Sequence, residues 1–150
     1  MTREGLEGHD QPHHRDLLRL LDYWRRQRGD RLFPRRSDID PVDFSYMLER
    51  VALTEIHENP RRYRLRVVGS WWAALVGFES TGTWMEDWPH LNQRQLSIET
   101  YEKLLAARRP LVAVRDAWVD NRKLSYEIMH LPLSEDGEHI SMIMTAIGPG

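Results

Sequence analysis

The stretch RYRLRVVGSWWAALVGFESTG, residues Arg62 to Gly82, decides the fold of this chain. Its opening residues alternate basic and apolar side chains, which is the period of a β-strand with two different faces. Gly69 ends that strand, a short apolar helical segment runs to Gly77, and a second turn follows at Thr81. A strand that stops at a glycine and passes into a very short apolar helix is typical of a small α+β domain rather than of a catalytic scaffold.

Length and composition set the outer limits. The chain has 150 residues, of which 41% are hydrophobic, which suits one domain with a core and is too little for two. The formal net charge of -2 gives no general reason to expect nucleic acid or an acidic membrane as a partner. No run approaches the ~18 apolar residues of a membrane span, and the polar start lacks the apolar core of a signal peptide. We therefore expect a cytoplasmic protein without nucleic acid or membrane as a partner.

The sequence contains no cysteine. Disulfides, thiolate metal sites, a cysteine nucleophile and a flavin or chromophore attached through a thiol are therefore excluded together. His9, His13 and His14 are spaced like metal ligands, but nothing in the polar segment around them would hold the geometry. We predict no metal site, and we expect residues 1–14 to form a mobile tail.

An amphipathic helix is predicted over residues 15–28. Leu17, Leu21 and Trp24 recur at helical spacing and would share one face. Arginines crowd the last turn, where unpaired carbonyls favour cations, and Gly29 can cap the helix. The apolar stripe must be buried, either against the rest of the domain or against the same helix of a second subunit.

Five strands are predicted, two before and three after a longer helix. They cover residues 51–56, 63–68, 111–118, 124–133 and 140–147. The longer helix begins near Asn92 and ends before Pro110, with an apolar stripe that includes Tyr101 and Leu104. This order predicts an α+β domain over residues 15–150, built on an antiparallel sheet with helices on one face.

Several short motifs follow one another along the chain. They are Trp24, the connector PRRSDIDP (34–41), the strand motif RLRVVG (64–69), Gly77 with Thr81-Gly82, and the turn PLSEDG (132–137). In their order and spacing, the chain resembles a bacterial single-domain PAS-like family over nearly its whole length. The resemblance implies a PAS-like five-stranded antiparallel sheet with helices on one face, plus an N-terminal amphipathic helix. It also implies a sensory or protein-interaction module in bacterial signalling rather than an enzyme.

Aromatic residues are candidates to line a ligand cavity between the sheet and the longer helix. They are Trp72, Trp84, Tyr101, Trp118 and Tyr126. The alternative is that they fill the core, because aromatic side chains bury large areas in small domains. The identity of the ligand, and whether one exists, stay open.

Haem is not expected as a cofactor. Those PAS domains that bind haem usually ligate the iron through a histidine on the longer helix, and residues 92–109 contain none. His90 is the nearest candidate. His130 lies in a predicted strand and is interpreted as a hydrogen-bonded strand histidine rather than a ligand.

Arg62 and Arg64 should lie on the outer face of the sheet, because they alternate with Tyr63, Leu65 and Val67, which should face the core or cavity. The resemblance makes that face a docking surface, so both are candidate partner contacts, together with Trp24 on the first helix. The expected partner is a second copy of the chain or a bacterial signalling protein, and the alternative is a solvated strand face. Arg66, which belongs to the strand motif, is a candidate to pair with an acid inside the fold.

No catalytic constellation is visible. Ser70 lacks the G-x-S-x-G elbow, and Gly69, Gly77 and Gly82 are too far apart for a phosphate-binding loop. We predict a non-enzymatic signalling domain that acts by protein contact and is modulated by a small apolar ligand. A small-molecule sensor proper and, with less support, a small enzyme are the alternatives.

Overall fold

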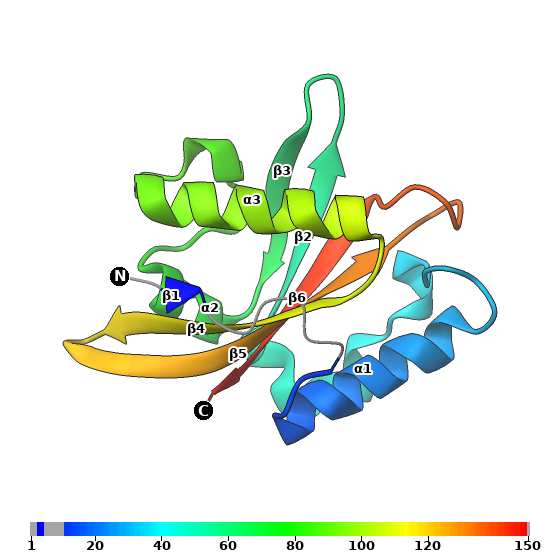
Figure 1. The fold of residues 1–150 in the computed structure, drawn as a ribbon, viewed down its shortest axis with the longest axis horizontal. Helices are drawn as coiled ribbons and strands as arrows, with labels where there is room; N and C mark the ends of the chain where they lie inside the picture. Colours follow the sequence, from blue (N-terminus) through cyan, green and yellow to red (C-terminus); the bar gives the residue numbers. More distant parts are fainter. Residues whose placement is uncertain (1–2, 5–10, 150) are drawn as a thin grey trace.

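An antiparallel sheet with strand order β1-β4-β5-β6-β2-β3 forms the centre of the molecule (Figure 1). This computed structural model describes residues 3–4 and 11–149. The strands are β1 (Arg3–Glu4), β2 (Val51–His57), β3 (Arg62–Val68), β4 (Leu111–Val119), β5 (Arg122–Leu133) and β6 (Met142–Pro149). The α-helices are α1 (Arg15–Arg28), α2 (Ser70–Val76) and α3 (Leu91–Ala107), and the 3₁₀ helices are η1 (Arg36–Asp38), η2 (Pro41–Arg50) and η3 (Met85–Asp87).

The five predicted strands are confirmed, each within two residues of its expected ends. The predicted tail, residues 1–14, falls largely outside the described residues. Within it, the short strand β1 pairs with β4, placing Arg3 opposite Asp116 and Glu4 opposite Arg115. That sixth strand was not predicted.

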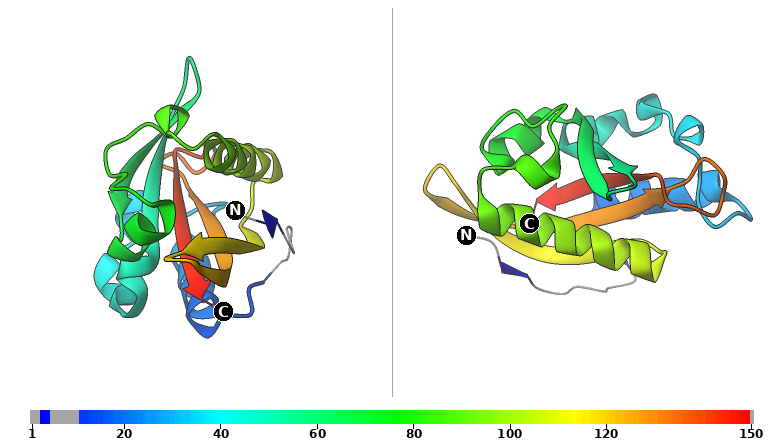
Figure 2. Two further views of the ribbon diagram at one scale, coloured as in Figure 1. Left: turned by 90° about the vertical axis from the view of Figure 1, so that its left-hand side faces the viewer. Right: turned by 90° about the horizontal axis from the view of Figure 1, so that it is seen from above.

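Helices lie on both faces of the sheet. Tyr126 and His130 of β5 face a cavity beneath α3, whereas Glu127 between them accepts hydrogen bonds from the backbone N–H groups of His13 and His14, just before α1. Because neighbouring side chains of a strand point to opposite faces, α3 and α1 lie on opposite sides of β5. The right-hand view of Figure 2 shows β5 and β6 between these two helices.

The apolar stripe of α1 is buried against the sheet of the same chain. Leu17, Leu21 and Trp24 are all buried, and the Trp24 indole Nε1–H donates to the carbonyl of Pro132 at 2.9 Å. Trp24 is only 1% exposed, so its prediction as a partner-surface residue is wrong. It lies on the inward stripe of a helix that covers part of the expected docking face.

Arg50, at the end of η2, ties the start of α1 to the sheet. Its guanidinium donates to the Asp16 carboxylate at 2.6 Å and to the carbonyl of Ile147 in β6 at 3.1 Å. This contact holds the pKa of the Asp16 carboxyl below its ordinary value. Gly148 permits the same close packing, because a Cβ there would lie 2.5 Å from the ring of His14.

Gly69 is required by a close approach of two backbones. A Cβ at this position would lie 2.3 Å from the carbonyl oxygen of Glu49 in η2, which is much closer than side chains tolerate. The strand therefore passes into α2 directly against η2. Gly77 then ends α2 with a φ of 92°, a conformation in which glycine carries no steric penalty.

A β-bulge changes the outer face of β3. Leu53 pairs with Val67 and Thr54 with Leu65, so that Arg66 is an extra residue in the strand. Alternation is reversed beyond it, and Val67 is 44% exposed. The prediction that Val67 faces the core is therefore wrong. Arg66 donates to the Glu55 carboxylate at 2.9 Å, as an arginine paired with an acid should. This ion pair lies at the surface, however, and not inside the fold as predicted.

Candidate functional site

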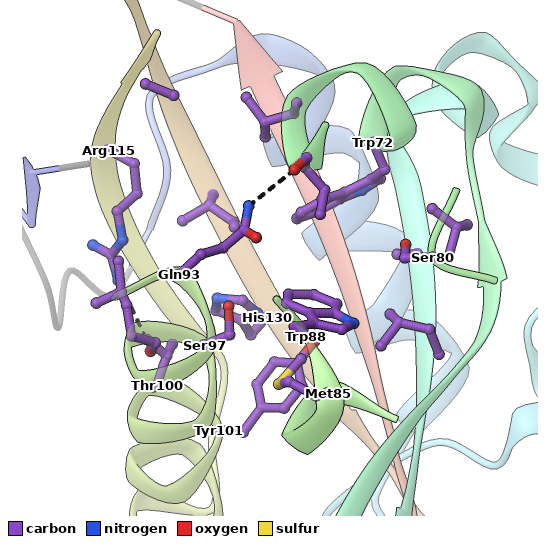
Figure 3. A pocket seen from close by; sticks show the side chains of 18 of the residues that line it. Trp72, Ser80, Met85, Trp88, Gln93, Ser97, Thr100, Tyr101, Arg115 and His130 are labelled. Atoms are coloured by element: carbon purple, nitrogen blue, oxygen red, sulfur yellow. Dashed lines mark hydrogen bonds between the residues drawn. The ribbon is translucent and has the colours of Figure 1, made fainter. Parts of the chain in front are cut away.

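A cavity of about 90 Å³ lies between α2, α3 and one face of the sheet (Figure 3). Its apolar wall comes from every neighbouring element and includes Leu65, Val68, Trp72, Met85, Trp88 and Ile128. Its polar groups are Ser80, Gln93, Ser97, Thr100, Tyr101, Arg115, Tyr126 and His130. A mostly apolar hollow with a few polar groups is the usual form of a small-molecule site.

Helix α3 presents a polar stripe to this cavity. Gln93, Ser97 and Thr100 follow one another at i, i+4 and i+7, so they share one face of the helix. Figure 3 shows Ser97 beside His130, the Gln93 amide directed along the dashed line to the carbonyl of Val76, and Ser80 at the far side of the pocket. Polar side chains on the inward face of a helix must find partners, because burying them unpaired is costly.

A hydrogen-bonded network closes the sheet side of the cavity. The hydroxyl of Tyr101 lies 3.0 Å from Thr54 Oγ1 and 3.4 Å from Thr145 Oγ1. His130 Nδ1 lies 2.9 Å from the same Thr145 oxygen, so the prediction of a hydrogen-bonded strand histidine is confirmed. Burial, with a smaller effect of the Arg115 charge, lowers the pKa of His130 to about 3. The imidazole is therefore neutral near pH 7.

Two buried oxygen atoms of the cavity wall have no hydrogen-bond partner in the described part of the chain. They are Ser80 Oγ and Gln93 Oε1. Ser80 is only 1% exposed, and the Gln93 amide nitrogen is already directed at the carbonyl of Val76, at 3.4 Å. Each unpaired buried group costs about 1–3 kcal/mol, so native proteins leave few of them.

Three of the five predicted cavity residues line the cavity: Trp72, Tyr101 and Tyr126. Burial raises the pKa of Tyr126 to about 12. Trp84 is elsewhere, because a bridge to Arg64 holds it beside β3. Trp118 is also elsewhere and is 54% exposed, since it lies near the tip of the β4–β5 hairpin, on the opposite side of the strand from Ala117.

Sequence reasoning missed the polar members of the site other than Tyr101 and Tyr126. Ser80 and Arg115 give no pattern that separates them from surface residues. Gln93, Ser97 and Thr100 did carry a signal, namely their helical spacing on the face that also holds Tyr101. That stripe was expected to be apolar.

A groove of about 540 Å³ lies on the opposite side of β2 and β3, against η2. Its lining includes Phe44, Leu48, Val51, Leu53, Val67 and Val68, with Arg36 and Glu49 among its charged members. Leu48 and Val67 are exposed apolar side chains there. Val68 lines both the groove and the cavity, so one strand end separates the two.

The predicted partner residues Arg62 and Arg64 lie near the Trp84 side chain rather than in the groove. The Arg62 guanidinium stacks 3.9 Å from the centre of the Trp84 ring. Arg64 is exposed and donates to the carbonyl of Gly82 at 3.2 Å. Cation–π stacking of this kind orders the arginine without removing its charge.

Metal-binding side chains do not gather in the part of the chain that the structure describes. No group of three or more His, Cys, Asp or Glu residues that could hold an ion occurs there. His9 lies outside the described residues, and His90 is exposed and does not line the cavity. Among the described helices, none combines the length and apolar character needed to cross a membrane.

A family model described as PAS domain matches residues 12–147. The chain belongs to the PAS domain family. PAS domains are generally sensory modules of signal transduction rather than catalysts, which places this chain in that broad class. A comparison with curated proteins found no match. In this PAS domain, the cavity lies between the sheet and α3, and the groove lies against η2 on the opposite side of β2 and β3.

Proposed function

We propose that this PAS domain is a signalling regulator whose protein contacts respond to a small molecule bound in the cavity. The observation that carries the proposal is the pair of unpartnered oxygens, Ser80 Oγ and Gln93 Oε1, in the cavity wall. A bound molecule would satisfy both and recover the free energy that their burial costs. This favours a ligand with polar groups over the apolar ligand expected from the sequence.

Hydrogen bonds connect the cavity to the opposite face. The indole of Trp72, which lines the cavity, donates to the carbonyl of Arg50 at 3.0 Å. The side chain of Arg50 in turn binds Asp16 of α1. Val68 is shared by cavity and groove. A ligand that moves Trp72 or Val68 therefore acts on groups that position both α1 and the groove.

The groove is the proposed contact surface, and a second copy of the chain is the proposed partner, in the predicted setting of the bacterial cytoplasm. Exposed Leu48 and Val67 give the groove an apolar surface, and desolvated apolar groups usually supply the centre of a protein interface. Arg62 and Arg64 extend the same sheet face with positive charge.

The geometry favours regulation over catalysis. Ser80 Oγ has no hydrogen-bond partner in the described chain, so no base activates it as a nucleophile. His130 has a pKa near 3 because it is buried, which is far from the range of a general base at neutral pH.

Occupancy of the cavity is tested by filling it. Ser97→Leu places extra side-chain volume in a cavity of about 90 Å³, and we expect it to abolish retention of a small molecule by the freshly purified protein. Native mass spectrometry, followed by analysis of the molecules released on denaturation, measures retention. Ser125→Leu, at an exposed position of β5, is the matched control. A wild-type protein that retains nothing would contradict the proposal.

The contact surface is tested by charge. Val67→Glu puts a carboxylate into the apolar groove, and we expect self-association to weaken by at least about tenfold, because the acid must be desolvated at the interface. Sedimentation equilibrium over a concentration series measures the dimer dissociation constant. Val42→Glu changes an equally apolar side chain that is more exposed and outside the groove, and should have little effect. Equal dissociation constants for both variants would exclude the groove as the dimer contact.

A further inference from the structure

The size of the cavity limits its ligand. An engineered cavity of about 150 Å³ holds benzene, with six non-hydrogen atoms. The cavity here has about 90 Å³, so by the same scale a molecule of about four non-hydrogen atoms fits without rearrangement. Haem, flavins and other large cofactors exceed this space many times over.

The unpartnered atoms determine which hydrogen bonds the ligand must make. Gln93 Nε2 is directed at the Val76 carbonyl, which assigns the remaining amide oxygen, Oε1, as the atom that faces the cavity unpaired. A carbonyl oxygen only accepts, so its partner must be an N–H or O–H donor. Ser80 Oγ both donates and accepts. At least one donor on the ligand is therefore required, and a second polar atom can be satisfied.

The hydrogen-bonding groups of the wall favour a neutral ligand. No Asp or Glu is among the lining residues, so a cation would find no counter-charge there. Arg115 lines the cavity, but its guanidinium already donates to the Val114 carbonyl and to Thr100 Oγ1, both at 3.4 Å. An anion without a donor has only acceptor atoms. It would place an acceptor against the acceptor Gln93 Oε1 and would leave that atom unsatisfied. Burial of an ion is costly unless it is paired and hydrogen-bonded.

Resting on the proposed function, we infer that the cavity takes a small, neutral, hydrogen-bond-donating molecule of the primary amide or alcohol class, bound by Gln93 Oε1 and Ser80 Oγ. Trp72 and Trp88 supply the apolar contacts around its carbon atoms. The polar ends of the molecule point to α3 and to the loop that carries Ser80.

Three probes of similar size separate the classes. Acetamide is neutral and donates, acetate has nearly the same shape but is an anion without a donor, and xenon is apolar. Titrations followed by ¹H–¹⁵N correlation NMR should show acetamide shifting the indole signals of Trp72 and Trp88, and binding at least tenfold more tightly than acetate or xenon. Tighter binding of acetate or xenon, or binding of none of the three, would overturn the inferred class. The proposed function is judged separately, by whether the purified protein retains any molecule.

Variants of the binding atoms test the assignment. Gln93→Leu removes the acceptor at similar volume and should weaken acetamide binding by about tenfold, in line with the loss of one buried hydrogen bond, while xenon binding is kept or improved. Gln95→Leu makes the same change at an exposed position of α3 and should leave both affinities unchanged. Ser80→Ala, a smaller change, should weaken acetamide by a few-fold. Unchanged acetamide affinity in both cavity variants would rule out these contacts.

Discussion

Replacing Trp24 with alanine is expected to lower the free energy of unfolding by about 3–5 kcal/mol. The indole is almost fully buried between α1 and the sheet, so its removal leaves a large cavity in the core. The substitution also removes the buried hydrogen bond from Nε1–H to the Pro132 carbonyl. Urea denaturation followed by circular dichroism measures the effect, with α1 and the sheet expected to unfold together.

Trp118→Ala is the matched control, because it makes the same chemical change at a side chain that is 54% exposed. We expect a change of about 0.5 kcal/mol or less there. Trp24→Phe keeps most of the ring but removes the donor, and should lie between the two. A loss for Trp118→Ala as large as that for Trp24→Ala would mean that burial does not determine the contribution of these tryptophans.

The contrast between these two tryptophans shows what the sequence could and could not predict. The period of Leu17, Leu21 and Trp24 was enough to place a helix and its buried face. It did not say what buries that face, since a sheet and a second subunit require the same stripe. That choice depends on the contacts of Trp24 with Pro132 and of Asp16 with Arg50, which join segments that lie far apart in the chain.

The β-bulge in β3 is a second feature that the sequence could not predict. Alternation along β3 placed Tyr63 and Leu65 inward correctly, because both are buried. The single extra residue at Arg66 then reversed the alternation, and Val67 emerged on the open face. A bulge inserts no sequence signal of its own here, so a period-two pattern cannot locate it.

Three aromatic members of the candidate site were predicted from the sequence, and its non-aromatic polar members were missed. Trp72, Tyr101 and Tyr126 were found because large aromatic residues are usually buried, but the same rule failed for Trp118, which is 54% exposed. Ser80 and Gln93 become informative only once burial is known, because unpaired serine and glutamine side chains are common on surfaces and rare inside.

Acidification should destabilise the protein through His130. The folded state holds the pKa of this histidine at about 3, whereas in the unfolded chain it is about 6.5. Below pH 6.5 this histidine therefore binds a proton in the unfolded chain but stays neutral in the folded chain, and the free energy of unfolding falls as the pH approaches 3. Between pH 7 and pH 4 this one group should remove about 3 kcal/mol.

His130→Gln isolates the effect, because glutamine can still hydrogen-bond Thr145 but does not titrate. The loss of stability between pH 7 and pH 4 should be smaller in this variant than in the wild type by about the same 3 kcal/mol, measured by urea denaturation at each pH.

His139→Gln is the control with the opposite sign. Its hydrogen bond to Asp136 raises the pKa of His139, so that histidine favours the folded state at low pH, and its removal should leave the acid-side loss as large or larger. Equal pH dependence in wild type and His130→Gln would mean that His130 accepts a proton without unfolding the cavity, and that the buried network around Thr145 is more open to water than its geometry indicates.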